Sequence, residues 1–184
     1  MWSEKTLSEI KIIDQPLPGL TILQCPSHID ERGDFRKIFH YNSLKLLGIN
    51  ILPAEIFLTR SKAGVIRGMH FQVGEAAHDK LVFCPQGRIL DVVVDIRAES
   101  PNFNKPISVE LSGDSETALV ISKGYGHGFL ALEENSCLLY STTTVHCPAL
   151  DRGVLWSSID FNWPTDQPIV SKRDNSLPPI QNFR

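Results

Sequence analysis

His70 is the residue whose type and surroundings most directly suggest chemistry in this sequence. It stands in the stretch VIRGMHFQ, residues 65–72, three residues after Arg67 and two before Gln72. An imidazole has an ordinary pKa of about 6.5, so it can exchange a proton near neutral pH. An arginine fork suits two phosphate oxygens. The stretch is therefore either a proton-transfer base beside a phosphate-binding arginine or a core histidine with satisfied hydrogen bonds.

A metal site is the alternative use of this histidine. Barrels that bind a metal place His-x-His on one strand, with a Glu downstream and a further His in a later motif. Here residues 70–72 are His-Phe-Gln, followed by Glu75 and His127, and a Gln amide is a poor ligand for zinc or iron. Glu75 and His78 could substitute, which keeps a metal-dependent enzyme as an alternative. We expect no metal ion at this histidine.

Other residues could complete a site for proton transfer at a carbon next to a carbonyl. That chemistry needs a carboxylate that orients the base, a cation or donor at the developing oxyanion, and a second acid on the opposite face if a centre is inverted. Lys80 and Tyr140 are candidates for the last two roles. Each also has an ordinary interpretation: Lys80 as a solvated edge residue, Tyr140 as a core residue and His127 as a residue that holds a turn.

Short strands must position these residues. Gly, Pro, Asn or Asp separates almost every pair of β-type runs, and many short strands at such spacing are typical of a sandwich or barrel. We predict an all-β fold, a cupin-like antiparallel jelly-roll barrel with a few short helices, in one domain over residues 1–184. The candidate strands are residues 21–25, 35–41, 55–60, 65–71, 80–85, 88–97, 107–112, 117–122, 128–133 and 137–145.

The run RILDVVVDIR, residues 88–97, shows the clearest alternation. Its even-numbered residues 90–96 are all apolar, and we expect this face to pack inward or against a partner sheet. The other face carries Asp91 and Asp95, which either lie in water or offer carboxylates to a site. One helix is predicted over residues 42–48, capped by Asn42. The Pro- and Asp-rich stretch from about residue 156 should wrap the barrel as a loop with one short helix.

Composition restricts the class of protein. The net charge of -3, from 18 Lys and Arg against 21 Asp and Glu, argues against nucleic-acid binding. The four cysteines are scattered without a C-x-x-C pair, as in a protein with reduced thiols. The first 15 residues have no signal-peptide core, and no apolar run approaches the roughly 20 residues of a membrane span. We therefore expect a cytoplasmic protein with no membrane or nucleic-acid partner.

Seven segments in order carry a resemblance that no single one would establish. Together they resemble the dTDP-4-dehydrorhamnose 3,5-epimerase family of nucleotide-sugar epimerases, over about residues 15–180. The segments are DERGDF (30–35), VIRGMHFQ (65–72), DKLVFCPQGRILDVVVDIRAESPNF (79–103), VISKGYGHGFLAL (120–132), LLYSTTT (138–144), DRGVLW (151–156) and VSKRD (170–174).

The resemblance implies an isomerase built as a jelly-roll homodimer, with no metal or organic cofactor. Its substrate is a nucleotide-diphosphate 4-keto-6-deoxyhexose, from which a proton is removed next to the ketone and to which one is returned on the opposite face. By the same resemblance His70 is the base, Asp174 its carboxylate partner, Lys80 the cation at the enolate oxygen and Tyr140 the opposite acid.

The resemblance also implies a set of substrate-binding residues. Arg67 grips the pyrophosphate, while Arg32 and Phe35 hold the sugar nucleotide, partly across the dimer interface. His127 is a second histidine of the pocket. Gln72 and Arg173, which neighbour the catalytic histidine and aspartate, complete this part of the set.

Departures from the family pattern cluster on the nucleotide. Lys37 stands where the family usually has a Glu that reaches thymine, and Glu55 and Phe57 replace a Q-x-N segment. Thymine presents a ring N–H donor, whereas cytosine presents an acceptor and an amino donor, which Lys37 and Glu55 would suit. CDP is thus the leading nucleotide, with dTDP the other.

Further departures concern stereochemistry. Val145 and His146 replace a common Tyr-Tyr, and residues 156–158 are Trp-Ser-Ser where W-N-D is frequent. The enzyme could therefore invert one carbon, or act on a 3,6-dideoxy sugar with nothing to invert at carbon 3. A non-catalytic nucleotide-sugar-binding barrel is the alternative to an epimerase.

Overall fold

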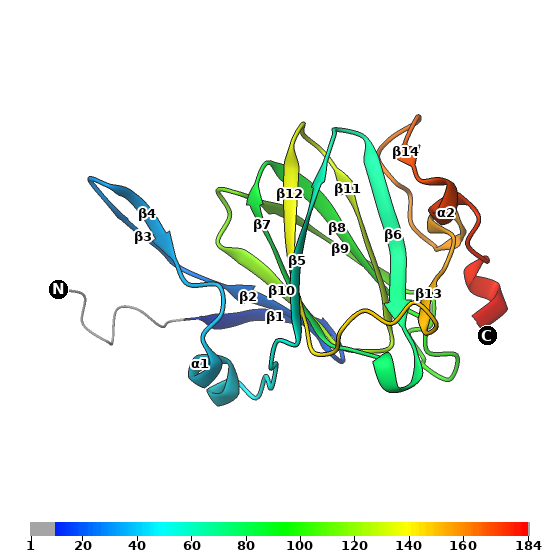
Figure 1. Cartoon of the computed structure of the whole chain (residues 1–184), viewed down its shortest axis with the longest axis horizontal. Helices are drawn as coiled ribbons and strands as arrows, with labels where there is room; N and C mark the ends of the chain where they lie inside the picture. Colours follow the sequence, from blue (N-terminus) through cyan, green and yellow to red (C-terminus); the bar gives the residue numbers. More distant parts are fainter. Residues whose placement is uncertain (1–9, 184) are drawn as a thin grey trace.

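The computed structural model describes residues 10–183, which form two facing β-sheets (Figure 1). The first sheet has the strand order β1-β2-β10-β7-β12-β5. Its strands are β1 (Lys11–Leu17), β2 (Leu20–Gln24), β5 (Glu55–Ser61), β7 (Lys80–Gln86), β10 (Thr117–Ile121) and β12 (Ser136–Thr142). Every pair of neighbouring strands within it is antiparallel.

The second sheet has the order β13-β6-β11-β8-β9, and the short strand β14 pairs with β6 in parallel. Its strands are β6 (Val65–Gln72), β8 (Arg88–Asp95), β9 (Pro106–Ser112), β11 (Tyr125–Ala131), β13 (Asp151–Gly153) and β14 (Ile169–Val170). The predicted all-β jelly roll is confirmed. A single domain over residues 1–184 stays a prediction, because residues 1–9 and 184 lie outside the described part.

The space between the sheets is filled from both sides by alternating side chains. Val82 and Leu138 from the first sheet meet Val93 and Phe129 from the second, and all four are almost completely buried. This packing continues toward β5 and β6, where polar residues replace the apolar ones. The core therefore fixes the spacing of the sheets, and polar chemistry is confined to one side of the sandwich.

The prediction for residues 88–97 was wrong about which face is internal. Val92 and Val94 lie on the outer face of the second sheet, where Trp163 and Ile180 of the C-terminal segment cover them. Asp91 and the other odd-numbered residues of β8 face the interior. An apolar strand face marks contact with any covering layer, and here that layer is an extended tail instead of a sheet. The prediction that this tail wraps the barrel is confirmed.

The tail contains little regular structure. Its short helices are η2 (Trp156–Ser158), α2 (Lys172–Asn175) and η3 (Ile180–Phe183). Ser171 caps α2, since its hydroxyl accepts a hydrogen bond from the Asp174 backbone N–H at 3.0 Å. A further short helix, η1 (Gly74–Ala76), follows β6. None of the helices in residues 10–183 is long and apolar enough to cross a membrane.

The N-terminal third differs most from its prediction. Residues 35–41 do not form one strand: β4 (Gly33–Arg36) ends early, and helix α1 (Tyr41–Leu46) begins within the run with His40 at its N-cap, not Asn42. Ile38 and Phe39 instead pack on the outer face of the first sheet beside α1. Strand β3 (Ser27–Asp30) pairs with β4 in a hairpin that projects from the body of the molecule (Figure 1).

Candidate active site

A cavity of about 730 Å³ opens between the two sheets beside β5 and β6. The strands on both sides turn alternate side chains into it, so polar groups far apart in sequence meet there. Nine of the twelve predicted site residues line it, namely Glu55, Arg67, His70, Gln72, Lys80, His127, Tyr140, Arg173 and Asp174.

His70 and Asp174 form a hydrogen-bonded pair on one wall. His70 Nε2 lies 2.8 Å from Asp174 Oδ1, and the side chains are 31% and 5% exposed. Burial raises the pKa of Asp174, but the hydrogen bond and charge of His70 and the Gly68 N–H outweigh it and hold the pKa below its usual value. Asp174 is therefore ionised at neutral pH, and its carboxylate orients the imidazole.

Gly68 makes this arrangement possible. The pairing of β6 with β11 shifts register between His127 and Phe129, because β6 carries an extra residue there. Gly68 has a φ of +138°, and a Cβ on it would lie 2.6 Å from the Gly128 Cα. Its N–H turns out of the ladder and donates to Asp174 Oδ2 at 3.2 Å. The glycine after Arg67 is thus required by backbone conformation and by close packing.

Lys80 lines the cavity from the first position of β7. Its side chain is buried, and its ammonium donates to the His70 carbonyl oxygen at 3.2 Å. Burial lowers the pKa of Lys80 to about 8, against the opposing charges of Asp91 and Asp151. The ordinary interpretation as a solvated edge lysine is wrong. The geometry supplies a cation within reach of an oxygen held near His70.

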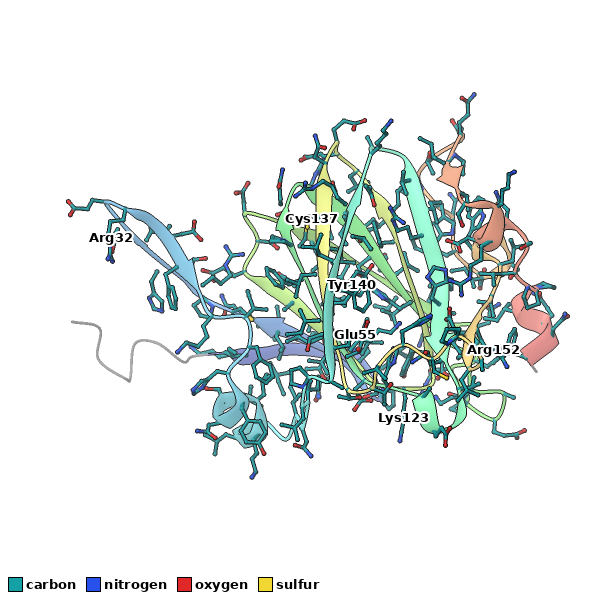
Figure 2. All side chains as sticks on the ribbon, in the orientation of Figure 1. Arg32, Glu55, Lys123, Cys137, Tyr140 and Arg152 are labelled. Atoms are coloured by element: carbon teal, nitrogen blue, oxygen red, sulfur yellow. The ribbon has the colours of Figure 1, made fainter. Side chains whose placement is uncertain are left out.

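Tyr140 projects from the opposite sheet, between the two layers (Figure 2). Its ring stacks on Phe57, with centroids 4.7 Å apart and an interplanar angle of 11°, and meets His127 edge to face at 5.8 Å. Burial raises the pKa of Tyr140 far above that of an ordinary phenol, even though Thr59 and Arg67 act to lower it. Tyr140 is therefore protonated at neutral pH and can serve as an acid.

A second histidine–aspartate pair, His127 with Asp91, lies beside the first. His127 Nε2 is 2.8 Å from Asp91 Oδ2, and the two side chains are 3% and 0% exposed. Among the described residues, Asp91 Oδ1 has no hydrogen-bond partner. Asp91 was absent from the predicted site, although the alternation of residues 88–97 had already placed its carboxylate on a face opposite the apolar one. Nothing in the sequence identified His127 as its partner.

Gln72 and Glu55 fasten the loop that follows β12. The Gln72 amide donates to the Ala76 and Val145 carbonyl oxygens, and its Oε1 accepts from the Cys147 N–H at 2.6 Å. Glu55 Oε2 accepts from the His146 N–H at 2.7 Å. Both predicted binding residues line the cavity, but each already uses a polar atom to hold residues 145–147 at its rim.

Arg67 and Arg173 lie at the cavity with partners of their own. Arg67 donates to Ser61 Oγ at 3.0 Å and to the Arg60 carbonyl oxygen at 3.2 Å. Arg173 forms an ion pair with Asp151 at 2.6 Å. Asp151 also lines the cavity and was not predicted. Both guanidiniums keep free donors and remain available to an anionic ligand.

His78 is a further cavity residue, which the sequence suggested only as a possible metal ligand. Its Nδ1 lies 3.1 Å from Gln72 Nε2, and its Nε2 is buried with no hydrogen-bond partner among the described residues. Burial and the charge of Lys80 lower the pKa of His78 to about 4, so it is neutral at neutral pH. Across residues 10–183, no group of three or more His, Cys, Asp or Glu side chains is placed to hold a metal ion.

Arg32, Phe35 and Lys37 do not line this cavity. Arg32 lies at the far tip of the β3–β4 hairpin, well away from Tyr140 (Figure 2). There it pairs with Asp30, which is two residues away, while Phe35 is 49% exposed. Within one chain, the structure does not bring these three residues to the other nine.

Comparison with known proteins identifies the family of this chain. The family model for dTDP-4-dehydrorhamnose 3,5-epimerase matches residues 14–182. The Salmonella typhimurium enzyme of that name is 36% identical, over 91% of this chain and 93% of its own. A Streptomyces niveus protein named dTDP-4-dehydrorhamnose 3-epimerase is 34% identical, over 79% of this chain and 72% of its own.

Solved structures show the same similarity in three dimensions. The Bacillus anthracis dTDP-4-dehydrorhamnose 3,5-epimerase, crystallised with TDP and PPi bound, superposes with a TM-score of 0.89 at 33% identity, covering 92% of this chain and 99% of that one. With sequence and fold matched over nearly the whole length, this chain belongs to the dTDP-4-dehydrorhamnose 3,5-epimerase family.

Proposed function

We propose that this protein epimerises a nucleotide-linked 4-keto-6-deoxyhexose at carbon 5, carbon 3 or both, using only its own side chains for acid–base chemistry. One observation carries the proposal: the His70–Asp174 pair and the Tyr140 phenol reach one cavity from opposite sheets. Inverting a carbon requires a base on one face of the ring and an acid on the other. Relatives of this chain are named for this reaction.

The first step removes a proton from the carbon beside the ketone. Because His70 Nε2 is bonded to Asp174, Nδ1 is the nitrogen that is left to accept the proton. The electron pair of the C–H bond forms a carbon–carbon double bond, and the ketone oxygen takes up the negative charge. The Lys80 ammonium stabilises that oxygen, and the Asp174 carboxylate stabilises the imidazolium.

The second step returns a proton on the opposite face. Tyr140 donates its phenolic proton to the carbon, the double bond collapses and the ketone re-forms. The resulting phenolate and the imidazolium then exchange protons with water, which restores the starting state. The raised pKa of Tyr140 keeps the acid loaded at neutral pH. His127 and Asp91 form the inner wall behind the phenol.

The reaction itself can be tested by proton exchange. Incubation with a nucleotide-linked 4-keto-6-deoxyhexose in deuterated water should introduce deuterium at each carbon that the enzyme deprotonates, as followed by NMR. His70→Ala should abolish this exchange and leave nucleotide binding nearly unchanged. If the wild-type protein bound the sugar nucleotide without exchanging any proton, it would be a binding barrel instead of an epimerase. The pattern of deuterium also separates inversion at one carbon from inversion at two.

We further propose CDP as the preferred nucleotide, with Arg67 on the diphosphate. Glu55 lines the cavity and keeps Oε1 for a donor such as the cytosine amino group. Lys37 lies outside the cavity of its own chain, so in this proposal it donates to an acceptor of the base from a partner protomer. Turnover of CDP- and dTDP-linked 4-keto sugars should be compared directly; a clear preference for dTDP would exclude this part of the proposal.

A homodimer would complete the site. Ile56 and Leu58 on the outer face of β5 are 62% and 57% exposed, and β5 is an edge strand. Arg32 and Phe35 on the projecting hairpin are exposed and away from their own cavity. We propose that the hairpin of one protomer reaches the cavity of its partner.

Hybrid dimers test this assembly. Arg32→Ala and His70→Ala inactivate a shared site from different protomers, so exchanging subunits between the two inactive variants should restore about a quarter of wild-type activity. No recovery after verified exchange would place both residues in one protomer's site.

We place the enzyme in the cytoplasm, where its four unpaired cysteines would stay reduced.

A further inference from the structure

Phe57 is a cavity residue to which the proposed reaction gives no role. It lies directly across from Tyr140 in the pairing of β5 with β12. The two rings stack almost in parallel, with an angle of 11° and a centroid distance of 4.7 Å. Both the direct cross-strand register and the ring geometry are those of a favourable aromatic pair.

The stack is one of two aromatic contacts that constrain the Tyr140 ring within the core. The Tyr140 ring also meets the His127 ring, with centroids 5.8 Å apart and an interplanar angle of 67°. His127 is itself immobilised by its hydrogen bond to Asp91. The Tyr140 ring is therefore held by two aromatic contacts, and the Phe57 ring lies nearly parallel to it.

The two rings differ in exposure. Tyr140 is 8% exposed and Phe57 is 42% exposed. Phe57, the more exposed of the two stacked rings, thus shields one face of the Tyr140 ring from water. Removing the Phe57 ring would open that side and leave the phenol free to rotate away from the reacting carbon.

We propose that Phe57 is a positioning residue for the acid of this site, holding the Tyr140 phenol in the plane from which it delivers its proton and keeping water from that ring. The inference rests on the proposed function, because it assigns Phe57 to the protonation step of that reaction. It requires no contact between Phe57 and the reacting carbon, and it separates Phe57 from the base side of the cavity.

The two half-reactions can be measured separately, and their ratio would not change if Phe57 had only a structural role. Deprotonation by His70 is read as wash-in of deuterium into the substrate. Inversion is read as formation of the epimeric product. If Phe57 acts through Tyr140, then Phe57→Ala should lower inversion about tenfold to a hundredfold, while wash-in falls less than about twofold.

A set of variants at position 57 separates the effect of a planar aromatic ring from the effect of side-chain volume. Phe57→Tyr keeps an aromatic face and should retain near wild-type inversion, whereas Phe57→Leu fills the space without a planar face and should behave like Phe57→Ala. Tyr140→Phe gives the reference ratio of exchange to inversion for loss of the acid. Tyr41→Ala is the matched control, since that ring is also partly exposed, at 36%, but lies on α1 outside the cavity.

Each outcome decides the proposal. An unchanged ratio of inversion to wash-in in Phe57→Ala, or equal loss of both, would overturn it, as would full rescue by Phe57→Leu. Thermal unfolding of each variant shows whether the fold persists, and the ratio within a folded variant is independent of the amount of active protein. Failure of the proposed function is a different result, because wild-type protein would then show no wash-in at all.

Discussion

His70 and His127 are direct neighbours across the pairing of β6 with β11, yet each ring is hydrogen-bonded to a different carboxylate. Asp174 reaches His70 from the C-terminal tail, and Asp91 reaches His127 from β8. The first pair is partly open to the cavity, whereas the second is almost completely enclosed. The same chemical unit is thus built twice in one wall, once accessible to a ligand and once as part of the framework.

This difference predicts that removing the two histidines will destabilise the protein by unequal amounts. His127→Ala would leave the buried Asp91 carboxylate without its partner, which should cost roughly 3–5 kcal/mol of unfolding free energy. His70→Ala leaves Asp174 with the Gly68 N–H and some solvent access, so its cost should be about 1 kcal/mol. Urea denaturation of both variants measures the difference. Equal losses of unfolding free energy would show that the enclosed His127–Asp91 pair stabilises the fold no more than the His70–Asp174 pair does.

Asp174→Asn should separate orientation of the base from folding. The amide keeps the size of the side chain but can neither stabilise the imidazolium nor fix the same tautomer, so kcat should fall by about a hundredfold or more. Steady-state kinetics with a sugar-nucleotide substrate measure this. Asp166→Asn, an exposed carboxylate in the same tail, is the control. An Asp174→Asn enzyme with normal kcat would remove Asp174 from the mechanism.

Lys80 predicts an alkaline limit on activity. Its pKa is about 8 in the folded protein, so the ammonium is present below that pH and is lost as the pH rises through it. The rate of proton wash-in should therefore decline above about pH 8. Lys80→Arg, which keeps its charge to higher pH, should shift that decline upward in whatever activity it retains. A wild-type rate that stayed constant to pH 10 would contradict a cationic role for Lys80.

The charge on Lys80 lowers the unfolding free energy, whereas the charges of an ordinary ion pair raise it. Because burial depresses the folded pKa of Lys80, charging it disfavours the folded state. This unfavourable contribution is fully present below about pH 8 and diminishes as the pH rises toward the unfolded value. Lys80→Met should thus stabilise the protein at pH 7 and gain less at pH 10, as measured by urea denaturation at the two pH values.

Gly68→Ala tests the backbone of the base strand. A methyl group there would meet the Gly128 backbone at 2.6 Å in addition to the strain of a positive φ. We expect a loss of more than about 3 kcal/mol of unfolding free energy. Gly48→Ala is the matched control, since its φ is +78° but no atom lies within 4 Å of the added Cβ, and it should cost about 1 kcal/mol. Similar losses in both variants would show that the close approach is easily relieved.

Glu55 can be tested for two separate roles. Glu55→Gln keeps an oxygen that accepts from the His146 N–H but removes the charge, so amide hydrogen exchange in residues 145–147 should stay slow. Any change in the preference for CDP over dTDP would then report contact with the base.

Gln72→Leu should instead speed amide hydrogen exchange at Cys147, because it removes the acceptor of that N–H. Slow exchange in Gln72→Leu would show that the loop does not depend on this amide.

Local patterning predicted the sheets well because strand alternation and turn residues are local signals. It failed where pairing is irregular. Strand β1 was missed, since it contains Asp14 and Pro16 and its register with β2 shifts twice. It failed again at residues 35–41, where Ile38 and Phe39 pack against the sheet face without joining a ladder. Apolar content alone does not reveal whether a segment pairs with a strand or packs on the face of a sheet.

The site was predictable only in part. His70, Lys80 and Tyr140 were identifiable as candidates by their chemistry, but the pairing of His70 with Asp174 joins residues separated by 104 positions, and only a family resemblance suggested it. Asp91 was visible on its strand face but was not assigned, because neither pattern nor resemblance linked it to His127. Gln72 was placed at the cavity correctly, while its bonds to residues 145–147 depend on how a distant loop closes over β6.

The tail that covers the outer face of the second sheet also delivers Asp174 to the base. Refolding should therefore proceed in two observable stages, with far-UV circular dichroism returning as the sheets form and turnover returning only after the tail has docked. The apolar surface that the tail buries is the driving force for that docking, so loss of Trp163 should delay catalysis without delaying formation of the sandwich.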